Sequence, residues 1–346
     1  MTEDRQELTI ASVTILAYEQ FQETRQIAER IPSARSAFNG ERPRSYAPPE
    51  ATLVSNATGP DPFQLQREAE RRIDRLLLAL HLLYGATTAN IFQVIGETTS
   101  VCRYTARLDE IVHDEHPVAV RPAVVSPATV EPVERLLALY DSTERRTEKE
   151  VVHGLEMAVL KFTESFAPKQ WFEKIVDLAT ALEATLSGTD KTDVTLRICT
   201  RAAHILSTDT DQPTAIYGDV KSLYDMRSRL VHGSVILQKE LDKWLLAVSS
   251  VSKDQSPRMR IEFAVDRLRD LVRRSILVRL LLNSDGRWPL RGDPPPLDQL
   301  FTDAHTAEDW RTAWHQGAAI LGAPDAVQPA SPLRHSVFDD YPGKGS

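Results

Sequence analysis

The spacing of apolar residues in the second half of the chain is that of α-helices. From about residue 148, hydrophobic side chains recur every three or four positions, which places them on one face of a helix. Prolines and glycines interrupt this pattern where helices are expected to stop. The predicted helices cover residues 151–166, 171–186, 194–206, 216–231 and 261–282. Because their connections are short, these helices are expected to pack as antiparallel neighbours in a bundle.

The first third of the chain has a different pattern. The run Leu8–Tyr18 is rich in β-branched residues, and short runs of the same kind recur within Asn90–Thr105, which predicts strands. Between them, residues 63–85 carry a strong amphipathic stripe that ends in a glycine, which predicts a helix. The expected fold class is mainly α, with a helical bundle at residues 148–283 preceded by a mixed α+β N-terminal domain at residues 1–147.

Two proline-rich segments indicate connections. Prolines recur at every fifth position from Pro117 to Pro132, and since proline cannot donate to a β-ladder, this segment is expected to be an extended connector with the domain boundary at or just after it. A C-terminal extension, residues 284–346, is expected to contain a short helix around Ala307–Ile320. From about residue 322, proline, alanine, serine and glycine dominate, which predicts disorder.

Composition and charge exclude several classes of function. The chain of 346 residues is 42% hydrophobic and 26% charged, which is typical of a globular protein. It has no apolar run of about 18 residues and no basic, apolar leader, so no membrane segment is expected and the predicted location is cytoplasmic. Two cysteines form neither a disulfide framework nor a cysteine-based zinc site.

The charge of the chain bears on nucleic-acid binding. A formal net charge of −8 argues against non-specific binding of nucleic acid over the whole surface. The segment Arg258–Arg279 is an exception, with seven arginines against three acidic residues. Two interpretations of this segment are open: a solvated helix face, or a surface that faces phosphates.

Known catalytic motifs are absent from the sequence. There is no P-loop, dinucleotide fingerprint, HExxH motif, nucleophile elbow or cluster of metal-ligating residues, so no cofactor and no metal are expected. One candidate remains in the stretch LYDMRSRLVHGS, where Arg227 precedes His232 with four residues between them. Four other Arg–His pairs in the chain have a similar spacing, so the spacing alone decides nothing.

The residues around this pair carry a family resemblance. The run LYDMRSRLVHG resembles the closing motif of the Apea-like HEPN domain, a branch of the HEPN superfamily with its RxxxxH motif. Upstream, KIVDLATALEATL at 174–186 and RICTRAAHIL at 197–206 resemble the second and third helices of that family, in the expected order. The resemblance covers about residues 148–283.

The resemblance implies cleavage of single-stranded RNA by a metal-independent endoribonuclease that works as a homodimer. It also implies a role as a defence or toxin-type effector, with RNA as the main partner and a sensor or regulatory partner at the N-terminal domain. Arg227 takes the family's arginine role, in which a guanidinium clamps the phosphate. His232 takes the histidine role, in which an imidazole moves a proton near neutral pH.

Helical geometry adds two expectations. Five residues at 100° each leave Arg227 and His232 about 140° apart and about 7.5 Å apart along the axis, so they share a face only if the helix loosens near Gly233. Arg227 lies on the apolar face of its helix and needs an anionic partner, for which Glu183 is the candidate. Arg201 is a second basic residue that can join this network or compete for it.

Three functional hypotheses follow. Many active HEPN motifs have Asn, Asp or His after the arginine, whereas this chain has Ser228, which keeps non-catalytic alternatives open. The chain is an endoribonuclease, or a HEPN module that binds RNA or a nucleotide without cleaving it, or a dimerising scaffold for protein partners. In the purely structural alternative, Arg227 pairs with Glu183 to hold the bundle together and His232 complements the dipole at the end of its helix.

Overall fold

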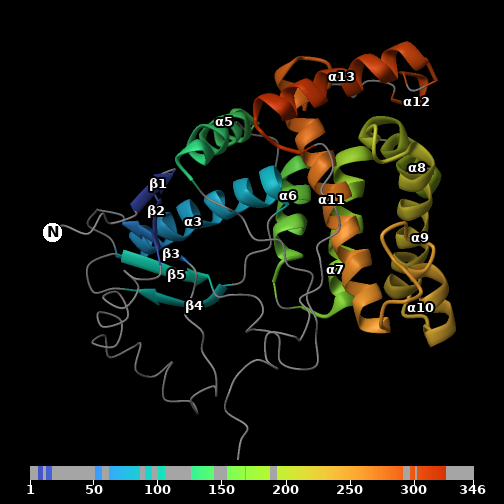
Figure 1. Ribbon diagram of the computed structural model, residues 1–346, viewed down its shortest axis with the longest axis horizontal. Coiled ribbons are helices and arrows are strands. Elements are labelled where there is room, and N and C mark those ends of the chain that lie inside the picture. Colours follow the sequence, from blue (N-terminus) through green and yellow to red (C-terminus); the bar gives the residue numbers. More distant parts are fainter. Residues whose placement is uncertain are drawn as a thin grey trace, which may run out of the picture.

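The computed structural model gives the backbone of five strands and most of the helical part of the chain (Figure 1). For the strands, only the backbone is described. The described residues are 7–10, 13–17, 51–56, 62–85, 90–95, 100–105, 126–143, 154–167, 169–187, 193–290, 297–300 and 302–324.

A helical bundle forms the second half of the described chain, as predicted. Its members are α6 (Gly154–Glu164), α7 (Trp171–Leu186), α8 (Val194–Leu206), α9 (Pro213–Val231) and α11 (Pro257–Ser284). These bounds lie within a few residues of those predicted from the apolar spacing, except for longer ends of α11. The short helix α10 (Gln238–Leu245) lies between α9 and α11.

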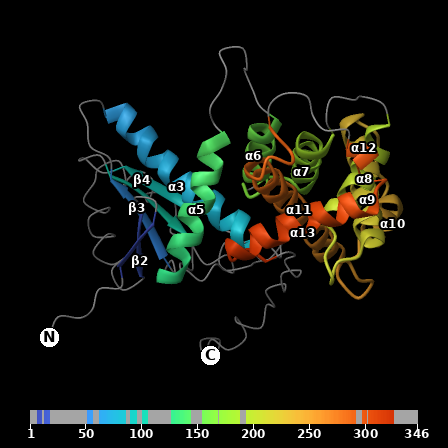
Figure 2. The same ribbon diagram turned by 90° about the horizontal axis from the view of Figure 1, so that it is seen from above.

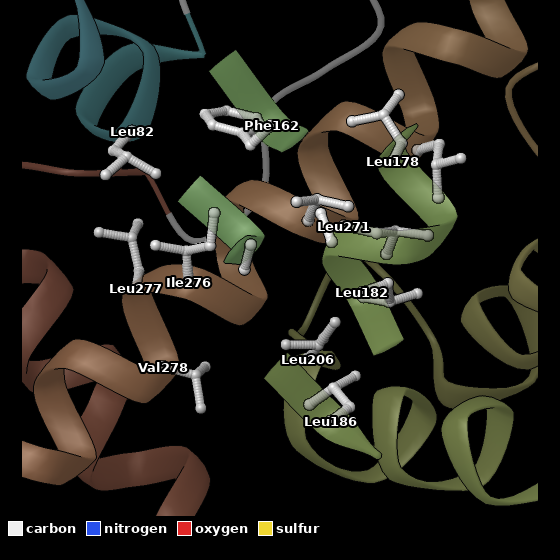
Figure 3. Close-up of a cluster of buried hydrophobic side chains, with 14 of the residues drawn as sticks. Leu82, Phe162, Leu178, Leu182, Leu186, Leu206, Leu271, Ile276, Leu277 and Val278 are labelled. Carbon is white, nitrogen blue, oxygen red and sulfur yellow. The ribbon is translucent and has the colours of Figure 1, made fainter. Parts of the chain in front are cut away.

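Helix α11 runs through the middle of the bundle, in contact with α6, α7, α8 and α13 (Figure 1). Figure 3 shows how Leu178 and Leu182 of α7 lie close to Leu271 of α11, and all three side chains are fully buried. Contacts of this kind bury apolar surface from several helices at once, and this burial is the main stabilising contribution to the bundle.

Most arginines of α11 lie inside the protein, whereas Arg258 at its start is exposed. Arg273 and Arg274 are among the largest fully buried side chains, and the Arg267 side chain is only 9% exposed. Arg267 and Arg274 both donate to the carboxylate of Asp211, and Arg273 donates to the carbonyl oxygen of Leu82 at 3.1 Å. From Arg267 onward, neither a solvated face nor a phosphate-facing surface describes this segment, because these arginines are buried or nearly so.

Helices α12 (Leu297–Leu300) and α13 (Ala304–Ile320) follow α11, and α13 lies across the bundle (Figure 2). The predicted helix near the C-terminus is therefore confirmed. The indole Nε1 of Trp314 donates to the carbonyl oxygen of Ile205 at 2.8 Å, and Arg311 donates to that of His204 at 2.9 Å. These side chains satisfy carbonyl groups in the last turn of α8, which no intrahelical donor reaches. The segment predicted to be disordered lies, from residue 325 on, outside the described residues.

The N-terminal strands pair as one antiparallel sheet in the order β1-β2-β3-β5-β4. The strands are β1 (Glu7–Ile10), β2 (Val13–Ala17), β3 (Ala51–Asn56), β4 (Asn90–Ile95) and β5 (Ser100–Thr105). Only the backbone pairing of this sheet is described, so the core discussed here is that of the helices.

The prediction of a mixed α+β N-terminal domain is wrong for the part of the chain whose side chains are described. That part is mainly helical and holds no strand. Its N-terminal members are the helices α3 (Pro62–Tyr84) and α5 (Pro127–Thr143), and their buried residues belong to the same hydrophobic cluster as those of the bundle. Other helices cover part of the apolar stripe of α3. The spacing of apolar residues in α3 predicts that this face is buried, but it does not specify which element buries it.

Helix α5 also corrects the predicted connector. Residues 127–132 are helical rather than extended, and Pro127 occupies the start of the helix, where its missing N–H costs nothing. Pro132 lies inside the helix, which is retained because the next turn buries Val133 and Leu136 in the core. The rest of the connector, and the boundary expected at residues 147–148, lie outside the described residues.

A helix that crosses a membrane must be both long and apolar. Across the described ranges, none of the helices combines the length and the apolar character that a bilayer span requires.

Candidate active site at the end of helix α9

The C-terminal end of α9 is closed by a glycine cap. Gly233 has a φ of +64°, and its N–H donates to the carbonyl oxygen of Leu230 at 3.2 Å. The N–H of Ser234 donates to the carbonyl oxygen of Arg229 at 3.1 Å. These two bonds form a Schellman motif, in which a left-handed residue ends the helix and satisfies its last carbonyl groups. The helix therefore stays regular up to Val231 and does not loosen, with His232 as its C-cap.

Because α9 stays regular, Arg227 and His232 leave it in different directions. Five residues of regular helix separate them by about 140° around the axis. Ser228 and His232 are exposed, and Ser228 is tied to the motif through its carbonyl oxygen, which accepts the N–H of His232 at 3.2 Å. The Cα–Cβ directions of the two predicted catalytic residues therefore point to different sides of α9.

Arg227 contacts the partner that the sequence suggested. Its Nη2 lies 3.5 Å from Oε2 of Glu183, and the two side chains are 29% and 25% exposed. The distance is that of an ion pair without a good hydrogen bond. Within the described part of the chain, the Nε of Arg227 has no hydrogen-bond partner. This Nε is buried, so an outside group can reach the guanidinium only through the exposed part of the side chain.

Tyr224 fixes the position of this pair. Its hydroxyl donates to the carbonyl oxygen of Ala179 at 3.0 Å, and the ring is only 3% exposed. One turn further along each helix come Arg227 and Glu183, so the bond between α9 and α7 sets their register. Burial, together with the nearby Glu183 carboxylate, raises the pKa of Tyr224 well above its ordinary value, so the phenol stays neutral.

Arg201 has partners of its own. Its Nε and Nη2 donate to the two carboxylate oxygens of Asp298, each at 2.8 Å, and its Nη1 donates to the carbonyl oxygen of Leu186 at 2.6 Å. This side chain fastens α12 to the end of α7 and does not enter the pair of Arg227 and Glu183. The expectation that Arg201 joins or competes for that network is therefore wrong among the described residues.

Apolar side chains surround the exposed end of α9. Val231, Val235 and Leu237 are 51%, 81% and 61% exposed. They flank His232 in sequence and were not identified as a feature from the sequence, because a pattern of apolar residues does not tell which of them remain uncovered.

Other candidate chemistry is limited in the described residues. No group of three His, Cys, Asp or Glu residues there is placed to hold a metal ion. Cys199 is 1% exposed, and burial raises the pKa of its thiol to about 11, so it is inert as a nucleophile. A cavity of about 420 Å³ opens between the first turn of α8 and α9, and no sequence motif indicated it.

Comparisons with protein-family models, with curated proteins and with solved structures found no match to this chain.

Proposed function

We propose that this chain is a metal-independent endoribonuclease of the HEPN type, which cleaves single-stranded RNA as a homodimer with Arg227 and His232 as its catalytic residues. The main support is their position at the exposed end of α9, in a bundle whose preceding helices carry the other two family-like elements in order. A cytoplasmic location, a defence or toxin-type role and a sensing role for residues 1–147 belong to the same proposal and rest on the resemblance and the sequence.

The chemistry follows from the two residue types. The exposed imidazole of His232 takes the proton from a ribose 2′-OH, whose oxygen attacks the adjacent phosphorus. The bond from phosphorus to the 5′-oxygen breaks, and a proton passes to that oxygen, which leaves a 2′,3′-cyclic phosphate and a 5′-hydroxyl. The guanidinium of Arg227 donates to the phosphate oxygens while their negative charge grows. The Arg227 side chain is 29% exposed, and this exposed part is what a phosphate can reach, because its Nε is buried.

The proposed site is shared between two copies of the chain. Because Arg227 and His232 diverge by about 140° on one helix, a site that holds both groups against one phosphate needs a contribution from a second α9. The exposed apolar side chains of Val231, Val235 and Leu237 flank His232 and offer a surface that a second copy can cover.

The first experiment compares three variants of the full-length chain. His232→Ala and Arg227→Ala are expected to lower the rate of cleavage of single-stranded RNA by at least about a hundredfold, which is the scale of a lost proton-transfer or charge-stabilising group. Arg229→Ala, an exposed arginine on the same helix, is the matched control and should cut like the parent. Cleavage should persist in EDTA. If purified His232→Ala cuts RNA as fast as the parent, the catalytic assignment is wrong.

A non-catalytic RNA-binding module is the second candidate. Two observations favour it: Arg227 already has an ion-pair partner, and His232 occupies the C-cap position of an ordinary glycine-closed helix end. In this case Arg227→Ala weakens RNA binding in a filter-binding or anisotropy assay, and no cleavage product forms under any condition. A dimer in sedimentation experiments that has no affinity for RNA would instead favour the scaffold.

A further inference from the structure

The cavity beside α8 has a lining suited to a planar, partly polar ligand. Its volume of about 420 Å³ falls in the range of roughly 300–1,000 Å³ that is usual for small-ligand sites. Val194, Leu196 and Cys199 line it with apolar atoms, and the half-buried ring of Tyr217 adds an aromatic surface. An aromatic side chain next to apolar walls is the arrangement on which nucleobases stack in single-stranded nucleic-acid sites.

One end of the cavity carries a lysine. Lys221 lines it, and the hydrogen bond from this lysine to Asp225 raises the pKa of the ammonium group, which therefore stays charged at neutral pH. Helix α8 begins at the same place, and its N-cap Asp193 makes no capping bond with its side chain. The first amides of α8 thus add partial positive charge to that of Lys221. A phosphate group bound near Lys221 would be attracted by its ammonium group, which Asp225 already pairs at 2.9 Å.

Two further groups can select the ligand. Asp193 and Thr195 both line the cavity and are exposed. A carboxylate is an acceptor only, so it favours a ring that carries an amino group and disfavours a carbonyl in the same place. Cytosine, adenine and guanine carry such an exocyclic amino group, whereas uracil does not.

The cavity and His232 lie along one side of α9. His232 comes eleven positions after Lys221 in the sequence. On a regular helix, the two side chains therefore point in directions about 20° apart and lie about 16 Å apart along the axis. By the same count, the side-chain directions of Tyr217 and Ser228 lie within about 40° of that of Lys221. A single RNA strand that passes His232 along this stripe reaches the cavity after a few nucleotides.

We propose that this cavity binds one nucleobase of the single-stranded RNA substrate, a base with an exocyclic amino group that lies a few nucleotides from the cleaved phosphate. The inference rests on the proposed function, since it names the sequence preference of the same site. Tyr217 stacks on the base, Asp193 at the start of α8 accepts its amino group, and Lys221 contacts its phosphate.

The experiment measures cleavage of an RNA pool in which each position around one cut site is randomised, with the products read by sequencing. The parent chain should disfavour uridine at one fixed distance from the cut by about tenfold. Asp193→Asn should reduce this preference, and it keeps the fold because asparagine tolerates the left-handed backbone at this position, where φ is 49°. Tyr217→Leu should flatten it as well. A parent without base preference at any position, or a Tyr217→Leu chain with unchanged preference, would overturn the inference.

A second measurement separates this inference from the proposed function. Cytidine and uridine monophosphates are titrated into the parent and into Tyr217→Leu, and binding is followed by calorimetry. Binding of cytidine monophosphate that is lost in Tyr217→Leu, in a chain that cuts no RNA, supports the cavity and contradicts the ribonuclease. Cleavage without base preference and without mononucleotide binding contradicts the cavity alone. Mononucleotide binding that RNA cannot displace assigns the cavity to a free nucleotide and overturns its role in the RNA substrate.

Discussion

At the scale of single residues, the motif on α9 holds two helices together and also contains a hydrogen-bond donor without a partner among the described residues. Tyr224 locks α9 to α7 through a buried hydrogen bond, and this lock places Arg227 beside Glu183. The guanidinium is held by one ion pair and keeps an Nε without a hydrogen-bond partner among the described residues. A residue used only to hold helices together would be expected to satisfy its donors more fully.

Tyr224→Phe tests this lock. The change removes the hydroxyl that donates to Ala179 while the ring still fills its space, so the free energy of unfolding should fall by about 1 kcal/mol. Urea denaturation measures the difference. Tyr217→Phe is the control, because the hydroxyl of Tyr217 makes no hydrogen bond in the described part of the chain. Equal stabilities for the two variants would show that the bond to Ala179 contributes nothing.

At the scale of elements, the end of α9 shows why one sequence feature supports two interpretations. A glycine directly after the histidine is what a helix end requires, and it is also part of the family-like motif. The two bonds of the Schellman motif account for Gly233 without any catalytic role. The same cap nevertheless holds the exposed His232 in a defined place, which an active-site residue also needs.

Two glycine substitutions, one just after α9 and one inside it, distinguish the contribution of the helix cap to stability from that of the helix body. Gly233→Ala should lower the free energy of unfolding by about 1 kcal/mol, because alanine is strained at a φ of +64° although its added Cβ meets no atom within 4 Å. Gly218 lies inside the helix, and a Cβ added there also meets no atom within 4 Å. Gly218→Ala should therefore raise the free energy of unfolding by about 0.5–1 kcal/mol. Thermal denaturation of both variants checks the two signs. A stabilised Gly233→Ala chain would mean that the helix continues past this residue.

At the scale of the whole molecule, a buried network of charges joins segments far apart in the sequence. Asp211, in the connection between α8 and α9, accepts hydrogen bonds from Arg267 at 2.7 Å and 2.8 Å and one from Arg274. Asp219 of α9 accepts from Arg267 at 2.7 Å and from the Ser249 N–H at 2.6 Å. The central helix therefore holds its neighbours by charge as well as by apolar packing.

The network predicts a loss of stability in acid. Burial alone would raise the pKa of Asp211, but the hydrogen bonds from Arg267 and the charge of Arg274 outweigh it and hold the pKa below its ordinary value. A carboxyl with a lowered pKa stabilises the fold above its ordinary pKa of about 3.9, and this contribution is lost as the pH falls through the folded-state value. Acid should therefore unfold the parent partly through this group.

Asp211→Asn measures the size of that effect. The variant should lose about 3–5 kcal/mol at pH 7, because two buried guanidinium groups lose their shared charge. Its remaining stability should fall less steeply than that of the parent between about pH 5 and pH 3. Asp209→Asn, an exposed residue of the same connection, should match the parent at every pH. Parallel pH profiles for the parent and Asp211→Asn would contradict the assignment.

The sequence by itself determined the helical bundle, because a repeated apolar spacing can be satisfied only by burial of one helix face. It also determined the stop of α9 at Gly233, since a left-handed helix end favours glycine, and it indicated Glu183 as the partner of Arg227. Only the tertiary structure decided which polar groups enter the core. Arg267, Arg273 and Arg274 of α11 can lie in the core because acidic residues and carbonyl oxygens from distant segments meet them there. Arg201 meets Asp298 for the same reason. Local periodicity carries no information on such long-range partners. The cavity beside α8 likewise exists only once the helices are in place, because residues of α8 and α9 line it together.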